Sequence, residues 1–178
     1  MLAICCLQPA RAQSPESDIK TYQSQVNVCL QKGDAPGAQA AIEQSLSAAE
    51  KAFAGTEKMV EPLDFAARAY AAMHQGPMAE RSLLKIIEIH KRVKGPKDPL
   101  VAQDQAVLAD LYASLGQLPQ ADSYYRQSID VLDRETFYRT SSLPPILDNF
   151  AKVLHAEKKD SEAKEVEEKA QKYRDKRF

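Results

Sequence analysis

The feature that most constrains the fold is that the sequence matches itself when it is shifted by about 42 residues. A small residue, an aromatic residue, a proline and a second small residue return in the same order in two central copies: Ala67, Tyr70, Pro77 and Ala79, then Ala109, Tyr112, Pro119 and Ala121. Weaker copies lie on either side, marked by Cys29, Pro36 and Ala38 and by Ala151, Leu154 and Ala163. A period of this length is typical of stacked supersecondary units.

Each copy has the apolar spacing of two helices separated by a turn. In the second copy, Leu63, Ala67 and Tyr70 form one stripe at helical spacing, and Leu83 and Ile87 belong to the next. The proline of Gly76-Pro77 suits the first position of a new helix, where its missing N–H is not needed. We expect four helix pairs, at about residues 19–55, 60–96, 98–136 and 142–178.

The recurring alanines predict how the pairs pack. Two helix backbones can approach closely only where the side chains between them are small, and Ala109 and Ala121 return at fixed places in the first and second helix. Because one helix pair cannot bury its own apolar stripe, the pairs must stack. The sequence therefore predicts an all-α fold, an α-solenoid of stacked antiparallel helix pairs, closed by a polar last helix over about residues 161–176.

Two segments carry a family resemblance: Ala109-Asp110-Leu111-Tyr112 through Leu115-Gly116-Gln117, and the connector Gly95-Pro96-Lys97-Asp98-Pro99. With them the chain resembles the tetratricopeptide-repeat (TPR) proteins, in particular the 42-residue repeats of the kinesin-light-chain type. The common TPR unit has about 34 residues, so these helices are longer. The resemblance implies a right-handed superhelix whose inner surface, lined by first helices, holds a peptide or a partner helix. It implies no particular partner.

The first helix of each pair uses one stripe for packing, so we expect its opposite stripe to face a groove. The candidate partner-binding residues on these stripes and beside them are Asn27, Asp64, Phe65, Arg68, Asp110, Asp148, Asn149, Lys152 and His155. Our hypothesis is that an extended peptide lies along them, held by the asparagines and charged groups, with Phe65 contacting an apolar anchor. The alternative is that this is only a solvated face.

Composition argues against other classes of function. The formal net charge is -1, which gives no field for attracting nucleic acid. No stretch approaches the roughly 20 apolar residues of a membrane span. The histidines, His74, His90 and His155, have no second ligand at the spacing of a metal site, and no phosphate loop, nucleophile motif or catalytic carboxylate pair is present. We therefore expect no enzyme activity, metal or cofactor.

The N-terminus indicates export. Residues 1–12 combine a short apolar run with Ala10-Arg11-Ala12, the small–x–small pattern that precedes signal-peptide cleavage, and residues 13–18 read as a linker. We expect a periplasmic or secreted protein in which Cys29 is the single remaining thiol, in a buried slot. The alternative is a frayed N-terminus on a cytoplasmic protein.

The leading functional prediction is a protein–protein interaction module, an exported adaptor or scaffold that is a monomer on its own and binds a partner in its groove. A second possibility is a permanent structural subunit of a larger envelope or secretion assembly, docked through its convex face. An enzyme would require a deep pocket with convergent titratable groups.

Overall fold

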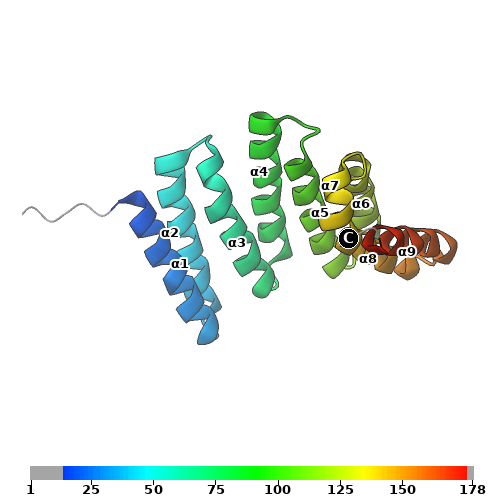
Figure 1. Ribbon diagram of the computed structural model, residues 1–178. Coiled ribbons are helices and arrows are strands. Elements are labelled where there is room, and N and C mark those ends of the chain that lie inside the picture. The colour runs from blue at the N-terminus through cyan, green and yellow to red at the C-terminus, as the bar shows by residue number, and fades with distance from the viewer. Residues whose placement is uncertain (1–13, 176–178) are drawn as a thin grey trace, which may run out of the picture. The chain divides into compact units, whose positions relative to one another are not determined.

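The computed structural model describes residues 14–175, and all their regular structure is helical (Figure 1). The chain divides into two compact units, Met1–Ala54 and Gly55–Phe178. The predicted signal segment, residues 1–12, lies outside the described residues.

The first unit is one helix pair, α1 (Pro15–Gln31) and α2 (Ala35–Phe53), packed side by side. Helix α1 begins earlier than the sequence predicts, because Ser14 caps it by accepting a hydrogen bond from the Ser17 N–H at 3.2 Å and Pro15 takes its first turn. Residues 15–18 are therefore helical, which corrects their prediction as a linker.

The second unit contains a short 3-10 helix η1 (Glu57–Met59) and three longer pairs. These are α3 (Val60–Ala72) with α4 (Gly76–Lys94), α5 (Pro99–Ser114) with α6 (Leu118–Leu132), and α8 (Leu143–Ala156) with α9 (Asp160–Asp175). Within this unit the second helix of one pair packs on the first helix of the next, α4 on α5 and α6 on α8. The predicted all-α solenoid of stacked helix pairs is confirmed.

Two short elements were not predicted, η1 and the six-residue helix α7 (Thr136–Ser141), which lies between the third and fourth pairs. Tyr138 packs from α7 against a buried cluster, and the Arg139 guanidinium donates to the Asp133 carbonyl at 2.6 Å. Six residues are too short for a helical period to stand out in the sequence, which is why this segment read as part of a connector.

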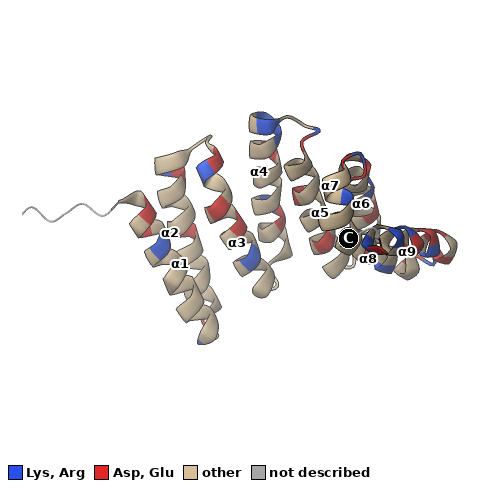
Figure 2. Ribbon diagram, in the orientation of Figure 1, with Lys and Arg blue, Asp and Glu red and all other residues tan. Residues whose placement is uncertain are grey.

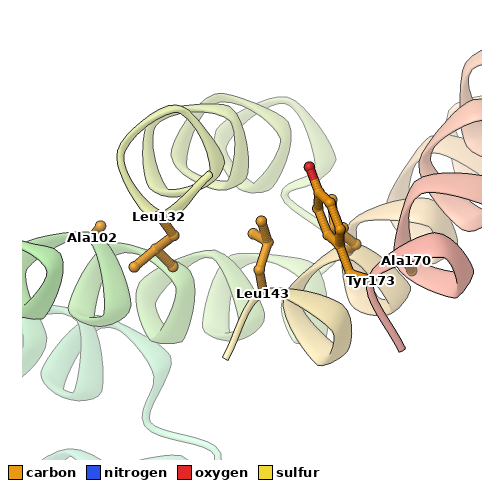
Figure 3. Close-up of a cluster of buried hydrophobic side chains, with 6 residues drawn as sticks. Ala102, Leu132, Leu143, Ala170 and Tyr173 are labelled. Atoms are coloured by element: carbon orange, nitrogen blue, oxygen red, sulfur yellow. The ribbon is translucent and has the colours of Figure 1, made fainter. Parts of the chain in front are cut away.

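The core lies where the repeated alanines meet the larger apolar side chains. Ala109, Ala121 and Ala163 are completely buried, as the close approach of helices requires. Figure 3 shows the cluster around Leu132 and Leu143, where α6 and α8 meet residues of α5 and α9. Ala170 and Tyr173 join this cluster from α9, so the last helix is docked on the stack while its remaining surface is charged (Figure 2).

The turn inside each pair repeats at the level of backbone geometry. Gly33, His74, Gly116 and Lys158 follow the first helix of successive pairs, and each has a positive φ, between 57° and 72°. Glycine adopts this left-handed conformation without steric cost, whereas other residues do so at some expense. The backbone turn is therefore the same in all four pairs even where the glycine is absent.

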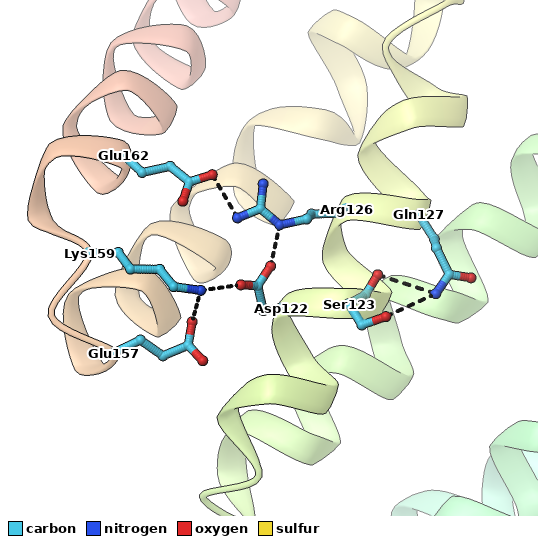
Figure 4. A network of polar contacts seen from close by, with 7 residues as sticks. All are labelled: Asp122, Ser123, Arg126, Gln127, Glu157, Lys159 and Glu162. Atoms are coloured by element: carbon cyan, nitrogen blue, oxygen red, sulfur yellow. Dashed lines mark hydrogen bonds and ion pairs between the residues drawn. The ribbon is translucent and has the colours of Figure 1, made fainter.

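A polar network fixes the fourth pair on the third (Figure 4). Asp122 of α6 lies between Arg126 and the Lys159 ammonium, the latter at 2.7 Å. Arg126 also reaches Glu162 of α9 at 2.6 Å. Burial alone would raise the pKa of Asp122, but the hydrogen bonds from Arg126 and Lys159 outweigh it and hold this pKa below its usual range. Asp122 therefore stays charged and links α6 to the last pair.

Candidate functional site

The clearest hollow among the predicted groove residues lies between α5 and α8. Its volume is about 390 Å³, and its lining residues are Asp110, Ala113, Leu118, Tyr125, Asn149, Lys152, Val153 and Ala156. Three of them, Asp110, Asn149 and Lys152, were predicted as binding residues. The hollow thus brings together residues of two first helices that are 39 or more positions apart in the chain.

The polar side chains of this hollow form one connected chain of hydrogen bonds. Lys152 Nζ donates to Asn149 Oδ1 at 3.1 Å, and Asn149 Nδ2 donates to Asp110 Oδ1 at 3.0 Å. The Tyr125 hydroxyl, which comes from α6, donates to the same carboxylate oxygen. Asp110 is therefore held by two donors from different helices, while Lys152 remains exposed at the edge.

Sequence reasoning missed Tyr125 because it belongs to a second helix, whose inner stripe was assigned to packing. Its ring is buried beside Phe150, with the ring centroids 5.5 Å apart, and only its hydroxyl reaches the groove residues. Burial, together with the hydrogen bond to Asp110, raises the pKa of Tyr125 well above its usual range. The hydroxyl therefore remains a hydrogen-bond donor across the range of pH in which proteins function.

Apolar side chains form the rest of the hollow. Val153 is buried and Leu118 is half-buried, and the small side chains of Ala113 and Ala156 leave space beside them. A polar edge over an apolar floor suits a segment that presents both backbone hydrogen-bonding groups and an aliphatic side chain.

Two of the predicted residues on α8 contact α9 and do not line the hollow. Asp148 pairs with Arg174. His155 lies between two carboxylates, with Nδ1 2.7 Å from Asp160 and Nε2 3.1 Å from Glu167. Fewer residues of α8 therefore face the groove than the sequence predicts, because α9 contacts Asp148 and His155.

On α3, Asp64 and Arg68 form an ion pair with each other at 2.7 Å, one helical turn apart. Phe65 is half-buried, whereas Val107, which holds the matching position on α5, is 49% exposed. Val107 is therefore a more accessible apolar contact than Phe65. Asn27 is exposed on α1, in the first unit.

His90 and Cys29 lie within the packing of the helices and do not line the hollow. His90 is buried between α4 and α5, and its Nδ1 lies 2.6 Å from Asp104 Oδ2. Burial raises the pKa of Asp104, although His90 opposes the shift. Cys29 is half-buried on α1, less enclosed than its predicted slot implied.

Within residues 14–175, no three histidine, cysteine, aspartate or glutamate side chains gather as a metal site requires. In the same stretch, no helix has both the length and the apolar character needed to cross a bilayer.

Known families and solved structures with helical repeats resemble this chain. The tetratricopeptide-repeat family model matches residues 59–134, the second and third helix pairs. No curated protein sequence matches the chain.

Solved structures share the fold. BtubC (BKLC) from P. vanneervenii superposes with a TM-score of 0.74 at 18% identity, over 92% of this chain and 66% of that one. A putative kinesin light chain of Podosopora anserina with nearly identical TPR-like repeats gives a TM-score of 0.52 at 16% identity, over 93% of this chain and 100% of its own. Because the sequence identities are only 18% and 16%, these structural similarities establish the fold and nothing further. Residues 59–134 thus match the tetratricopeptide-repeat family, and the returning alanines and the repeated turn give the other helix pairs the same architecture.

Proposed function

We propose that this protein is an adaptor or scaffold that holds an extended segment of a partner protein in the hollow between α5 and α8. Tetratricopeptide-repeat domains bind protein partners and generally act as scaffolds without catalysis. The observation that carries the proposal is the hydrogen-bonded chain of Lys152, Asn149 and Asp110 above an apolar floor.

The chemistry of the hollow indicates what such a segment would offer. Asp110 can accept from a peptide N–H, and the Lys152 ammonium can donate to a peptide carbonyl or carboxylate. An aliphatic side chain of the partner would rest on Leu118 and Val153. Because Asn149 and Tyr125 already position Asp110, little ordering is needed when the partner arrives.

We further propose that the adaptor is exported, which rests on the reading of residues 1–12 as a signal peptide. Mass spectrometry of the protein from its native source would test this. A mature chain starting at Gln13 supports export, and a chain that retains residues 1–12 contradicts it.

The second candidate, a permanent subunit of an assembly, is favoured by one observation. A groove of about 670 Å³ lies between α6 and α9, away from the hollow of Asp110, and Ile129 and Val166 line it beside charged side chains. Light scattering separates the two proposals, because an adaptor is stable when purified alone, whereas an obligate subunit is stable only with its partner.

The binding experiment is affinity capture from the native extract with the wild type and Lys152→Glu. Lys164→Glu, on the exposed surface of α9, is the matched control. We expect Lys152→Glu to lose the partner, with unchanged helicity by circular dichroism, and the control to retain it. Capture of the same proteins by all variants would contradict binding in this groove.

A further inference from the structure

A hollow of about 680 Å³ lies on the first helix pair and is lined by residues of α1 and α2. The residues that matter for its chemistry are Tyr22 of α1 and Ala40, Glu43, Ser47, Ala48 and Lys51 of α2. This face is distinct from the hollow between α5 and α8.

The repeat shows what such a face does elsewhere in the fold. Under the shift of 41 or 42 residues, Tyr22 corresponds to Leu147 and Ala48 corresponds to Tyr173. In the last pair, Leu147 and Tyr173 are buried against Leu132 of α6, in the cluster of Figure 3. The corresponding face of α1 and α2 is therefore of the kind that a neighbouring helix covers, and Ala48 leaves a hollow at the place that Tyr173 fills in the last pair.

Charges on α2 indicate which helix fits. Glu43 and Lys51 both line the hollow, and at eight residues apart they are separated by about 12 Å along the helix, too far to pair with each other. Among residues 14–175 neither forms an ion pair, although Glu43 accepts a hydrogen bond from Gln39 Nε2 at 3.0 Å. Ser47 lies midway between them.

The spacing of Glu43 and Lys51 on either side of Ser47 makes the face complementary in charge to a second copy of itself. If a second α2 crosses the first in the antiparallel direction at Ser47, Glu43 of each copy faces Lys51 of the other, which gives two ion pairs related by a two-fold axis. The small side chains of Ala40, Ser47 and Ala48 allow two helices to approach closely at this point. One further charged side chain, Asp18 of α1, lines the same hollow.

We propose that two copies of this chain associate through the face formed by α1 and α2, in a symmetric contact centred on Ser47. The sequence alone led us to expect a monomer, and this proposal departs from that expectation. A dimer of this kind leaves the hollow between α5 and α8 available, since that hollow belongs to other helices.

The test uses charge reversal and sedimentation velocity of the full chain across a range of concentrations. Glu43→Lys and Lys51→Glu should each weaken association by at least about tenfold, because each creates two like-charge contacts. An equimolar mixture of these two variants should associate again, since every contact in the mixed pair is then of opposite charge. Glu88→Lys, on the exposed surface of α4, is the control and should associate like the wild type.

Position 47 gives an independent readout. In a background in which Cys5, Cys6 and Cys29 are all replaced by Ser, Ser47→Cys should form a disulfide-linked dimer on mild oxidation, because the two copies meet at that residue. A wild type that is monomeric at all concentrations would overturn the proposal. So would charge-reversal variants that associate like the wild type, or a mixture that fails to restore association when both variants have wild-type helicity.

Discussion

The side-chain amide of Asn149 donates to the carboxylate of Asp110 across 3.0 Å, and this bond joins α8 to α5 at the edge of the hollow. The two residues lie in different repeats, at neighbouring places on the first-helix stripe. Asp110 also receives the Tyr125 hydroxyl, so the position of this carboxylate depends on three helices. The packing of α5, α6 and α8 therefore holds Asp110 in place at the edge of the hollow.

This arrangement predicts the effect of Tyr125→Phe. The ring stays buried, but Asp110 loses one donor, so we expect the free energy of unfolding to fall by about 1 kcal/mol in urea titrations. Tyr124→Phe is the control, because the described residues give the Tyr124 hydroxyl no hydrogen bond and its ring stacks on Tyr112. Equal stability of Tyr125→Phe and the wild type would show that the hydroxyl does not hold Asp110.

The repeated left-handed turn predicts two stabilising substitutions. His74→Gly and Lys158→Gly should each raise the free energy of unfolding by up to about 1 kcal/mol, because glycine adopts a positive φ without the steric cost of a Cβ. The greater freedom of glycine in the unfolded chain reduces this gain. Gln75→Gly, next to His74 but at a φ of -92°, should destabilise the protein. Loss of stability in all three variants would contradict the assignment of the turn.

Acid should weaken the protein through Asp122 and Asp133. Burial acts to raise the pKa of each carboxyl, but hydrogen bonds from Arg126 and Lys159 to Asp122, and from Lys169 and Tyr173 to Asp133, lower both. A carboxyl whose pKa is lower in the folded chain stabilises the fold above its unfolded pKa of about 4, and this stabilisation is lost as the pH falls through the folded pKa.

Urea titrations across the acidic range should therefore show stability falling below about pH 5, with a shallower fall for Asp122→Asn. Asp130→Asn is the control, because its pair with Arg134 lies on the exposed surface of α6. If Asp122→Asn and the wild type lose stability equally with acid, the network of Figure 4 does not stabilise the stack.

The contribution of His155 to stability should depend on pH in the opposite direction, because it is lost as the pH rises. Both of its ring nitrogens lie within hydrogen-bond distance of carboxylates, which requires both to carry protons. The hydrogen bonds to Asp160 and Glu167 raise the pKa of His155, so its contribution to holding α9 is complete below its unfolded pKa and is lost as the pH rises through the folded one.

A nuclear magnetic resonance titration should give His155 a pKa above 6.5, and Asp160→Asn with Glu167→Gln should bring it down. Lys164→Gln, between these residues on α9, is the control for a change of charge that removes neither bond. A His155 pKa that does not respond to loss of the two carboxylates would contradict the geometry.

The repeat made most of the architecture predictable. The period placed the helix pairs, and the returning alanines identified the contacts between helices, since Ala109 and Ala121 are buried as the packing argument required. Helix α7 was not predictable from the period, because it falls between repeats and is only six residues long. The start of α1 depended on the capping hydrogen bond of Ser14, a local effect outside the apolar pattern.

The groove was predictable in part. Stepping along the first helices identified Asp110 and Lys152, with Asn149 beside the stripe, and all three line the hollow. The same stepping could not show that α9 takes Asp148 and His155, because that depends on long side chains, Arg174 and Glu167, reaching back from the next helix. Nor could it show that Tyr125, whose ring is buried on α6, reaches Asp110 with its hydroxyl.

The most direct test of partner binding is site-specific photo-cross-linking in the native extract, with a photoreactive amino acid placed at Ala156, which lines the hollow, or, separately, at Lys85 on the exposed surface of α4. Binding in the hollow predicts a discrete cross-linked partner from position 156 and none from position 85. A partner that cross-links from position 85 but not from position 156 would contradict it.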